Sequence, residues 1–264
     1  MTPLGFLHAN GFPAESYRQL FKVWQPHYRV LALPMLGHDP HYPVVAHWRK
    51  QADEWVAWLQ SHADFPIWGV GHSLGAVVTF MAAWSHPHLF QGIILLDPPL
   101  VNGPAAWGFA LSKLLGRIDE VTPAGRTAGR RQVWPDWESA QSYFMSKNLY
   151  RHFDPRCLED YMRSGLQEQS DGSFSLRFRP EIEVELFRNT PYDSWRYRRA
   201  LQVPGCLVRG AHSQVTTVAA AHRMVQRHGL QFREVAGGHM FPLEQPEMTA
   251  EVVLELIKMM RYAR

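Results

Sequence analysis

The sequence has few of the features that mark several large classes of protein. Only two of its 264 residues are cysteine, Cys157 and Cys206, which is too few for a disulfide framework, and the pair lacks metal-ligand spacing. No stretch approaches the roughly 18 uninterrupted apolar residues that a membrane-spanning helix needs. The amino terminus has no basic region followed by an apolar one. We therefore expect a soluble, cytoplasmic protein with reduced cysteines and no membrane span.

An excess of charge of one sign is also missing. Lys and Arg number 27 against 24 Asp and Glu, a net charge of +3 that is spread along the chain. This balance does not favour nucleic acid or a membrane surface as a partner. Hydrophobic residues, at 46%, are abundant beside 19% charged residues, so the chain can bury a sizeable core and is not disordered.

Short apolar segments alternate with helical patterns along most of the chain. Each segment is bounded by Gly, Pro or a polar turn, as is typical of buried parallel strands. The six segments are residues 4–8, 28–33, 67–71, 92–96, 205–209 and 231–235. Helical stripes lie between them, for example around Trp55, after Ser73 and from Pro246 onwards. The alternation predicts an α/β fold with a mostly parallel sheet of about six strands flanked by helices.

Residues 101–200 break this alternation. They contain no convincing buried strand, but Asp136 and Asp154 resemble helix N-caps, and residues 181–188 have a helical pattern. The segment is rich in aromatic residues. We expect it to form a helical cap over the carboxyl edge of a core made of residues 1–100 and 201–264. Its basic stretch, Arg126, Arg130 and Arg131, is expected to form a solvated face, with an anion-binding role as the alternative.

A candidate nucleophile lies between the third strand and the following helix. Gly71-His72-Ser73-Leu74-Gly75 has the pattern G-x-S-x-G, in which a sharp turn forces the central residue into strained backbone geometry between small neighbours. The Ser73 hydroxyl would stand at the amino end of the helix, where the dipole favours negative charge. His72 belongs to this turn and is expected to orient packing rather than to transfer protons.

A serine hydroxyl needs a base, and His239 is the best-placed histidine of the fourteen. It lies in Gly237-Gly238-His239-Met240, a glycine turn between the last strand and the last helix. Parallel strands bring their carboxyl ends to one edge of the sheet, so this turn is expected to lie near Ser73.

The loop after the first strand, Asn10-Gly11-Phe12-Pro13, is the third element. Acyl transfer places negative charge on a carbonyl oxygen, which two backbone N–H groups can stabilise. Leu74 and Phe12 are the predicted donors of this oxyanion hole, although a plain strand-end turn is the alternative for the loop. Asn10, His72 and Met240, which adjoin these groups, are the predicted substrate-binding residues.

In this order the three features closely resemble the α/β-hydrolase family over nearly the whole chain. Asn10-Gly11-Phe12-Pro13 is similar to the family's His-Gly-Phe-Pro loop, with Asn in place of His, and residues 33–39 resemble the stretch after its next strand. The resemblance implies the α/β-hydrolase fold with an inserted helical cap. We expect the antiparallel pair of strands with which the family usually begins to be absent from this sheet.

The resemblance leaves the acid of the catalytic triad open. The family usually carries a carboxylate in the loop that reads Gly210 to Thr216 here, where Gln214 takes the place of Asp. Some branches carry the acid on the strand after the nucleophile helix, which implies Asp97. Asp97 is also a good strand-ending residue before Pro98. A neutral Gln214 that orients His239 is the other alternative.

By resemblance, the chain is a serine hydrolase, similar to esterases and lipases, that cleaves a small to medium carboxylic ester or thioester through an acyl-enzyme on Ser73. Three alternatives stay open: a C–C bond hydrolase, a cofactor-free haloperoxidase or perhydrolase on the same triad, and a non-catalytic binding protein. The sequence implies no metal and no organic cofactor. It implies a small-molecule ester as the partner and does not indicate the oligomeric state.

Overall fold

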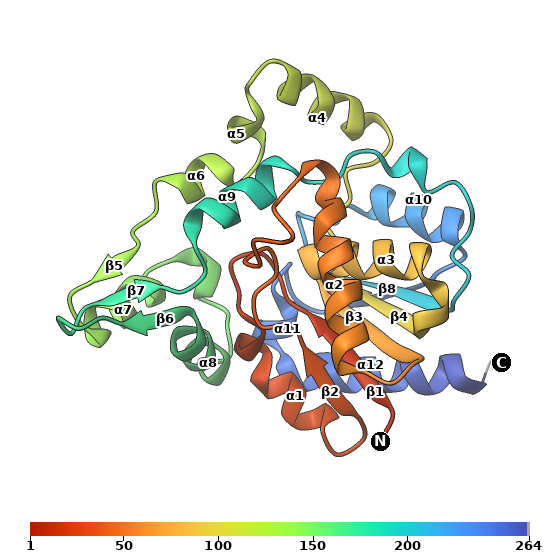
Figure 1. Ribbon diagram of the computed structural model, residues 1–264, viewed down its shortest axis with the longest axis horizontal. Coiled ribbons are helices and arrows are strands. Elements are labelled where there is room, and N and C mark those ends of the chain that lie inside the picture. Colours follow the sequence, from red (N-terminus) through yellow and green to blue (C-terminus); the bar gives the residue numbers. More distant parts are fainter. Residues whose placement is uncertain (263–264) are drawn as a thin grey trace.

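The main sheet of the protein has six parallel strands. We describe residues 1–262 from a computed structural model (Figure 1). The strands are β1 (Pro3–Leu7), β2 (Arg29–Ala32), β3 (Ile67–His72), β4 (Phe90–Leu96), β8 (Gly205–Gly210) and β9 (Gln231–Val235). They lie in the order β2-β1-β3-β4-β8-β9, and each neighbouring pair is parallel. The predicted α/β fold with a parallel sheet of six strands is confirmed.

The strand order reverses direction between β1 and β3. From β1 the chain moves outward to β2, and then returns to the other side of β1 to form β3, where Leu7 pairs with Gly71. The loops that follow β1 and β3 therefore diverge from neighbouring strand ends. In open parallel sheets such a switch point is where ligands bind.

Helices cover both faces of the sheet. α1 (Arg18–Trp24) and α12 (Pro246–Tyr262) lie on one face, while α2 (Arg49–His62), α3 (Leu74–Ser85) and α10 (Val218–His228) lie on the other, with α2 and α3 in front of the sheet in Figure 1. Successive side chains of a strand point to opposite faces, and so Phe6 packs with Trp24 of α1 while Leu7 belongs to the core with Trp55 of α2. Two buried cores result, one on each face.

A long segment is inserted between β4 and β8, which are neighbours in the sheet. It occupies the upper and left parts of Figure 1. Its helices are α4 (Pro104–Leu114), α5 (Ile118–Val121), α6 (Ala124–Ala128), α7 (Trp137–Met145), α8 (Pro155–Gly165) and α9 (Pro180–Arg188). The carboxylates of Asp136 and Asp154 accept N–H groups of Ser139 and Arg156, which confirms both predicted N-caps.

The insert also contains a small antiparallel sheet that the sequence did not predict. Its strands β5 (Val133–Trp134), β6 (Leu166–Glu168) and β7 (Phe174–Leu176) lie in the order β5-β7-β6. The six helices of the insert are thus joined by three short strands, where the sequence showed no convincing strand. Strands of two or three residues are too short to show an alternating pattern in sequence.

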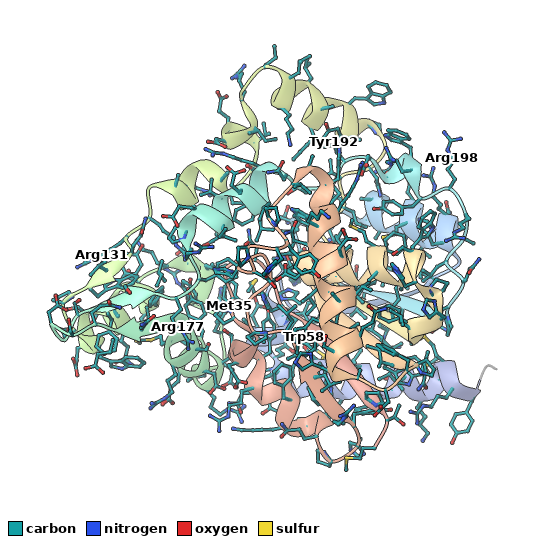
Figure 2. All side chains as sticks on the ribbon, viewed as in Figure 1. Met35, Trp58, Arg131, Arg177, Tyr192 and Arg198 are labelled. Atoms are coloured by element: carbon teal, nitrogen blue, oxygen red, sulfur yellow. The ribbon has the colours of Figure 1, made fainter. Side chains whose placement is uncertain are left out.

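The predicted solvated arginine face is divided between two environments. Arg131 is exposed at the edge of the insert (Figure 2). Arg130 instead turns inward, and its Nη2 lies 2.9 Å from Oε2 of Glu183 on α9, whose side chain is buried. The prediction of a solvated face was wrong for Arg130, because its acidic partner lies 53 residues further along the chain.

Short turns of 3₁₀ helix and one further helix complete the described chain. α11 (Phe241–Glu244) lies between β9 and α12. The 3₁₀ turns are Ala14–Tyr17, Ala46–Trp48, Pro87–Leu89, Asn148–Tyr150 and Ser194–Arg196. Within residues 1–262, no helix has both the length and the apolar character needed to cross a bilayer.

Candidate active site

Ser73 lies at the sharp turn between β3 and α3, with φ of 53° and ψ of −118°. Two glycines permit this turn. A β-carbon on Gly71 would collide with the backbone of Gly75, and one on Gly75 would collide with the carbonyl of Leu7 on β1. Since neither backbone can move away without disrupting the sheet, only glycine fits at both positions. The turn therefore packs directly against the end of β1.

Three side chains from three strand ends form a hydrogen-bonded chain. The Ser73 Oγ lies 3.0 Å from His239 Nε2, and His239 Nδ1 lies 2.7 Å from Asp97 Oδ2. Asp97 is fully buried, while Ser73 is 9% exposed and the His239 side chain 21% exposed. This arrangement matches a nucleophile, base and acid in which the base remains open to solvent.

Asp97 directly follows β4, and its carboxylate is held on both oxygens. Oδ1 accepts the N–H of Gly210 at 2.9 Å, and Oδ2 accepts the hydroxyl of Ser213 as well as the His239 ring. Its backbone has φ of 44°, and its N–H donates to Val208 of β8. These bonds hold the carboxylate so that Oδ2 faces His239.

Gln214 lies outside this arrangement. It is exposed, and the polar contact of its amide is with the carbonyl oxygen of the nearby His212. The neighbouring residue, Ser213, contacts Asp97 instead. The sequence reasoning did not identify Ser213. Its place just after β8, the sheet neighbour of β4, was the available signal.

The loop after β1 forms a tight turn closed by a hydrogen bond from the Phe12 N–H to the Ala9 carbonyl oxygen, at 3.1 Å. Gly11 occupies the third position of the turn with φ of 80°, as a type II turn requires. A substrate oxygen would therefore share the Phe12 N–H with Ala9. Leu74, the other predicted donor, is the first residue of α3, so its N–H has no acceptor within the helix.

His72 is not placed to bind substrate. It is fully buried, with its Nδ1 2.7 Å from the Tyr17 hydroxyl and its Nε2 3.0 Å from the backbone oxygen of His239. Burial lowers its pKa to about 3, and the nearby His239 contributes to the shift. The prediction of His72 as a substrate-binding residue is therefore corrected, while the expectation that it orients packing agrees with these contacts.

The other two predicted substrate-binding residues, Asn10 and Met240, are largely buried. Asn10 donates from Nδ2 to the Glu183 carbonyl oxygen at 3.0 Å, which links the loop after β1 to α9 of the insert. Met240, next to His239, is buried at the start of α11. Their contact with substrate stays a prediction.

The insert packs directly over the loop after β1. The Glu183 carboxylate lies against Gly11, where a β-carbon would meet it at 2.9 Å. Burial raises the pKa of Glu183, while the Arg130 guanidinium beside it opposes that shift. The ring of Phe12 packs on Tyr161 of α8, with 4.9 Å between the centroids. In the part of the chain described, no group of three or more His, Cys, Asp or Glu side chains is arranged to hold a metal ion.

Comparison with known sequences assigns this architecture to a family. The model of the alpha/beta hydrolase family matches residues 6–252. The type I acyl-CoA thioesterase mpaH of Penicillium roqueforti is 28% identical over 153 residues, which make up 58% of this chain and 28% of that protein. The (E)-2-((N-methylformamido)methylene)succinate hydrolase of Acinetobacter baylyi is 24% identical over 139 residues, 50% of this chain and 52% of that protein. The matches thus span about a quarter and about half of these relatives.

Solved structures share the fold over a greater length. The crystal structure of E-2-(acetamidomethylene)succinate hydrolase superimposes with a TM-score of 0.81 at 20% identity, and covers 97% of this chain and 91% of that one. The thioesterase domain from the curacin biosynthetic pathway gives a TM-score of 0.75 at 18% identity, with 96% and 91% covered. At these identities the likeness concerns the fold alone.

Proposed function

The chain belongs to the alpha/beta hydrolase family, and on that premise we propose that it is a serine hydrolase that cleaves a small to medium carboxylic ester or thioester. The observation that carries the proposal is the hydrogen-bonded chain from Ser73 Oγ through His239 to Asp97. A serine next to an imidazole, itself oriented by a buried carboxylate, is the arrangement that makes a hydroxyl nucleophilic.

The hydrogen-bond directions suit the first step of acyl transfer. Asp97 accepts from His239 Nδ1–H, which leaves Nε2 free to take the Ser73 proton. As Ser73 Oγ bonds to the substrate carbonyl carbon, the carbonyl π pair moves to its oxygen. The imidazolium then gives its proton to the leaving alcohol or thiol, and the bond to that group breaks. An acyl ester on Ser73 remains.

Water completes the cycle by the same route. His239 Nε2 takes a proton from a water molecule, whose oxygen attacks the acyl carbon, and then returns the proton to Ser73 as the acid departs. In both steps the developing oxyanion would accept from the Leu74 N–H and from the Phe12 N–H, the latter shared with Ala9. Because Leu74 has no competing acceptor within α3, we infer that it is the stronger of the two donors.

We further propose that residues 101–200 act as a cap over this site. The contacts of Glu183 with Gly11 and Asn10 support this role, because they place α9 on the loop that carries the Phe12 N–H. The acyl-CoA thioesterase among the relatives favours a thioester as the second substrate class to test.

A fluorophosphonate probe tests the proposal, since it reacts with activated serines. We expect labelling of the native protein at Ser73 and none in Ser73→Ala. Ser85→Ala, at the far end of the same helix, is the matched control and should label normally. Label in Ser73→Ala, or none in the native protein, would contradict the proposal and favour a non-catalytic binding protein. Esters and acyl-CoA thioesters of graded acyl length would then define the substrate.

A further inference from the structure

A buried row of polar groups connects the loop after β1 with the backbone of His239. The Ala9 N–H donates to the Tyr17 hydroxyl oxygen at 3.2 Å. The Tyr17 hydroxyl lies 2.7 Å from His72 Nδ1, and His72 Nε2 lies 3.0 Å from the His239 carbonyl oxygen. Both Tyr17 and His72 are fully buried, so water does not compete for these bonds.

The chemistry of the two ends fixes the direction of every bond in the row. A carbonyl oxygen can only accept, and so the hydrogen on the His72 ring must be on Nε2. A neutral imidazole then has a bare Nδ1, which accepts the Tyr17 O–H. The Tyr17 oxygen in turn accepts the Ala9 N–H. The low pKa of His72, about 3, is consistent with the neutral ring that this row requires.

We propose that Tyr17 and His72 are positioning residues that hold the base His239 in register with the predicted oxyanion loop. The row touches the site at two points. Ala9 is the residue whose carbonyl closes the turn around Gly11 and Phe12, and His239 bears the ring that bonds Ser73. A shift at either end changes the distance between the base and the oxyanion donors. This inference rests on the proposed function of Ser73 and His239.

The row matters because His239 lies in a glycine turn. Gly237 has φ of 111°, and the loop between β9 and α11 is short, so its path depends on the bonds that its backbone makes. The His72 ring also packs beside the His239 ring, with 5.1 Å between their centroids. His72 thus supports both the backbone and the ring of the base, while Tyr17 ties that support to the loop after β1.

Tyr17→Phe removes the central hydroxyl and keeps the ring, and Tyr150→Phe is the matched control. Tyr150 is also buried, and its hydroxyl makes one buried hydrogen bond, to Tyr161, which is outside the row, whereas the Tyr17 hydroxyl makes two within it. We expect Tyr17→Phe to lower kcat and the rate of fluorophosphonate labelling by about 10-fold or more, with KM little changed, since small displacements of reacting groups are costly. Tyr150→Phe should leave both rates near the native values at a comparable thermal midpoint.

Two further readouts separate positioning from general stability. His72→Phe should lower kcat, and His72→Gln should restore part of it, because the Gln amide N–H can donate to the His239 carbonyl. In ¹⁵N–¹H spectra of the histidine side chains, His72 should be protonated at Nε2, and the His239 ring signals should move in Tyr17→Phe and not in Tyr150→Phe.

The outcomes distinguish this inference from the proposed function. Equal behaviour of Tyr17→Phe and Tyr150→Phe in both kcat and the His239 signals would overturn the inference, even with Ser73 fully labelled. If native Ser73 takes no label while the His239 signals respond to Tyr17→Phe alone, the proposed function fails and the positioning role stands.

Discussion

Ser73 and Asp97 both have a positive φ, which residues with a β-carbon rarely adopt. Their φ values are 53° and 44°, and each follows directly on a strand, β3 or β4, that neighbours the other in the sheet. Such conformations cost on the order of 1–3 kcal/mol each and persist where the surrounding structure imposes them. Here both side chains bond the ring of His239. We infer that the strain at both residues serves to aim their side chains at one imidazole.

Replacement of the acid gives a direct test at the residue scale. Asp97→Asn removes the negative charge that fixes the His239 tautomer, so we expect kcat on a p-nitrophenyl ester to fall by at least ~100-fold. Gln214→Ala should have little effect, because Gln214 is exposed and its amide is near His212. Urea unfolding of both variants would establish that they are folded. Small and equal effects on kcat would refute Asp97 as the acid.

For single residues, the sequence predicted which ones follow the strands, but it did not predict which side chains the loops bring into contact. That Ser73, Asp97 and His239 meet at one edge of the sheet was predictable because each follows a recognisable strand. Ser213 was missed because its hydroxyl reaches Asp97 only through the course of the loop after β8. His72 was assigned to substrate binding from its place beside Ser73, yet its side chain points to Tyr17 and His239.

At the scale of elements, a buried carboxylate joins α2 to the loop after β2. Glu54 accepts the Gly37 N–H, at 2.9 Å from Oε2, and is largely buried. Burial raises its pKa to about 7, from the ordinary value of 4.5 that the group has in the unfolded chain. The folded protein therefore binds the proton more tightly than the unfolded chain, and the stability that the protonated form contributes is lost as pH rises from 4.5 through 7.

Glu54→Gln tests this assignment through the pH dependence of stability. The amide of the variant keeps an acceptor for the Gly37 N–H and cannot ionise. The difference in free energy of unfolding between Glu54→Gln and the native protein should therefore shift by about 2 kcal/mol in favour of the variant as the pH rises from 5 to 8. Urea unfolding at the two pH values measures the change. Glu251→Gln, on the exposed side of α12, is the control and should follow the native curve. If the free energy of unfolding of Glu54→Gln changed with pH as it does in the native protein, the prediction would be contradicted.

The elements also show where periodicity fails as a signal. The six strands of the main sheet were found because each lies in a segment of strand length between turn residues, although β9 has only two apolar residues, Phe232 and Val235. The strands of the insert escaped notice because two or three residues carry no period, and their pairing depends on contacts between residues far apart in sequence.

At the scale of the molecule, the insert meets the core around an ion pair in which Glu183 is buried and Arg130 is largely buried. Arg130 and Glu183 are 53 residues apart within the insert, and Glu183 contacts Gly11 and Asn10 of the core. Each charge offsets the cost of removing the other from water. Loss of one charge therefore lowers the free energy of unfolding more than loss of both.

Glu183→Ala should lower the free energy of unfolding by about 3 kcal/mol, because it leaves the Arg130 guanidinium without its acid. The double variant Arg130→Met/Glu183→Leu removes both charges, and its free energy of unfolding should lie within about 1 kcal/mol of the native value. Urea unfolding of the two variants and the native chain provides the comparison. A double variant as unstable as Glu183→Ala would show that the charges themselves stabilise the insert.

The sheet, its flanking helices and the strand ends that carry Ser73, Asp97 and His239 follow from the order of the amino acids, because they depend on local patterns and on the geometry of parallel strands. Other features could be read only from the folded chain: the hydrogen-bond partners of Asp97, the inward turn of Arg130, the engagement of the Phe12 N–H and the row through Tyr17 and His72. They depend on side-chain direction and loop path, which arise from contacts between residues distant in the chain.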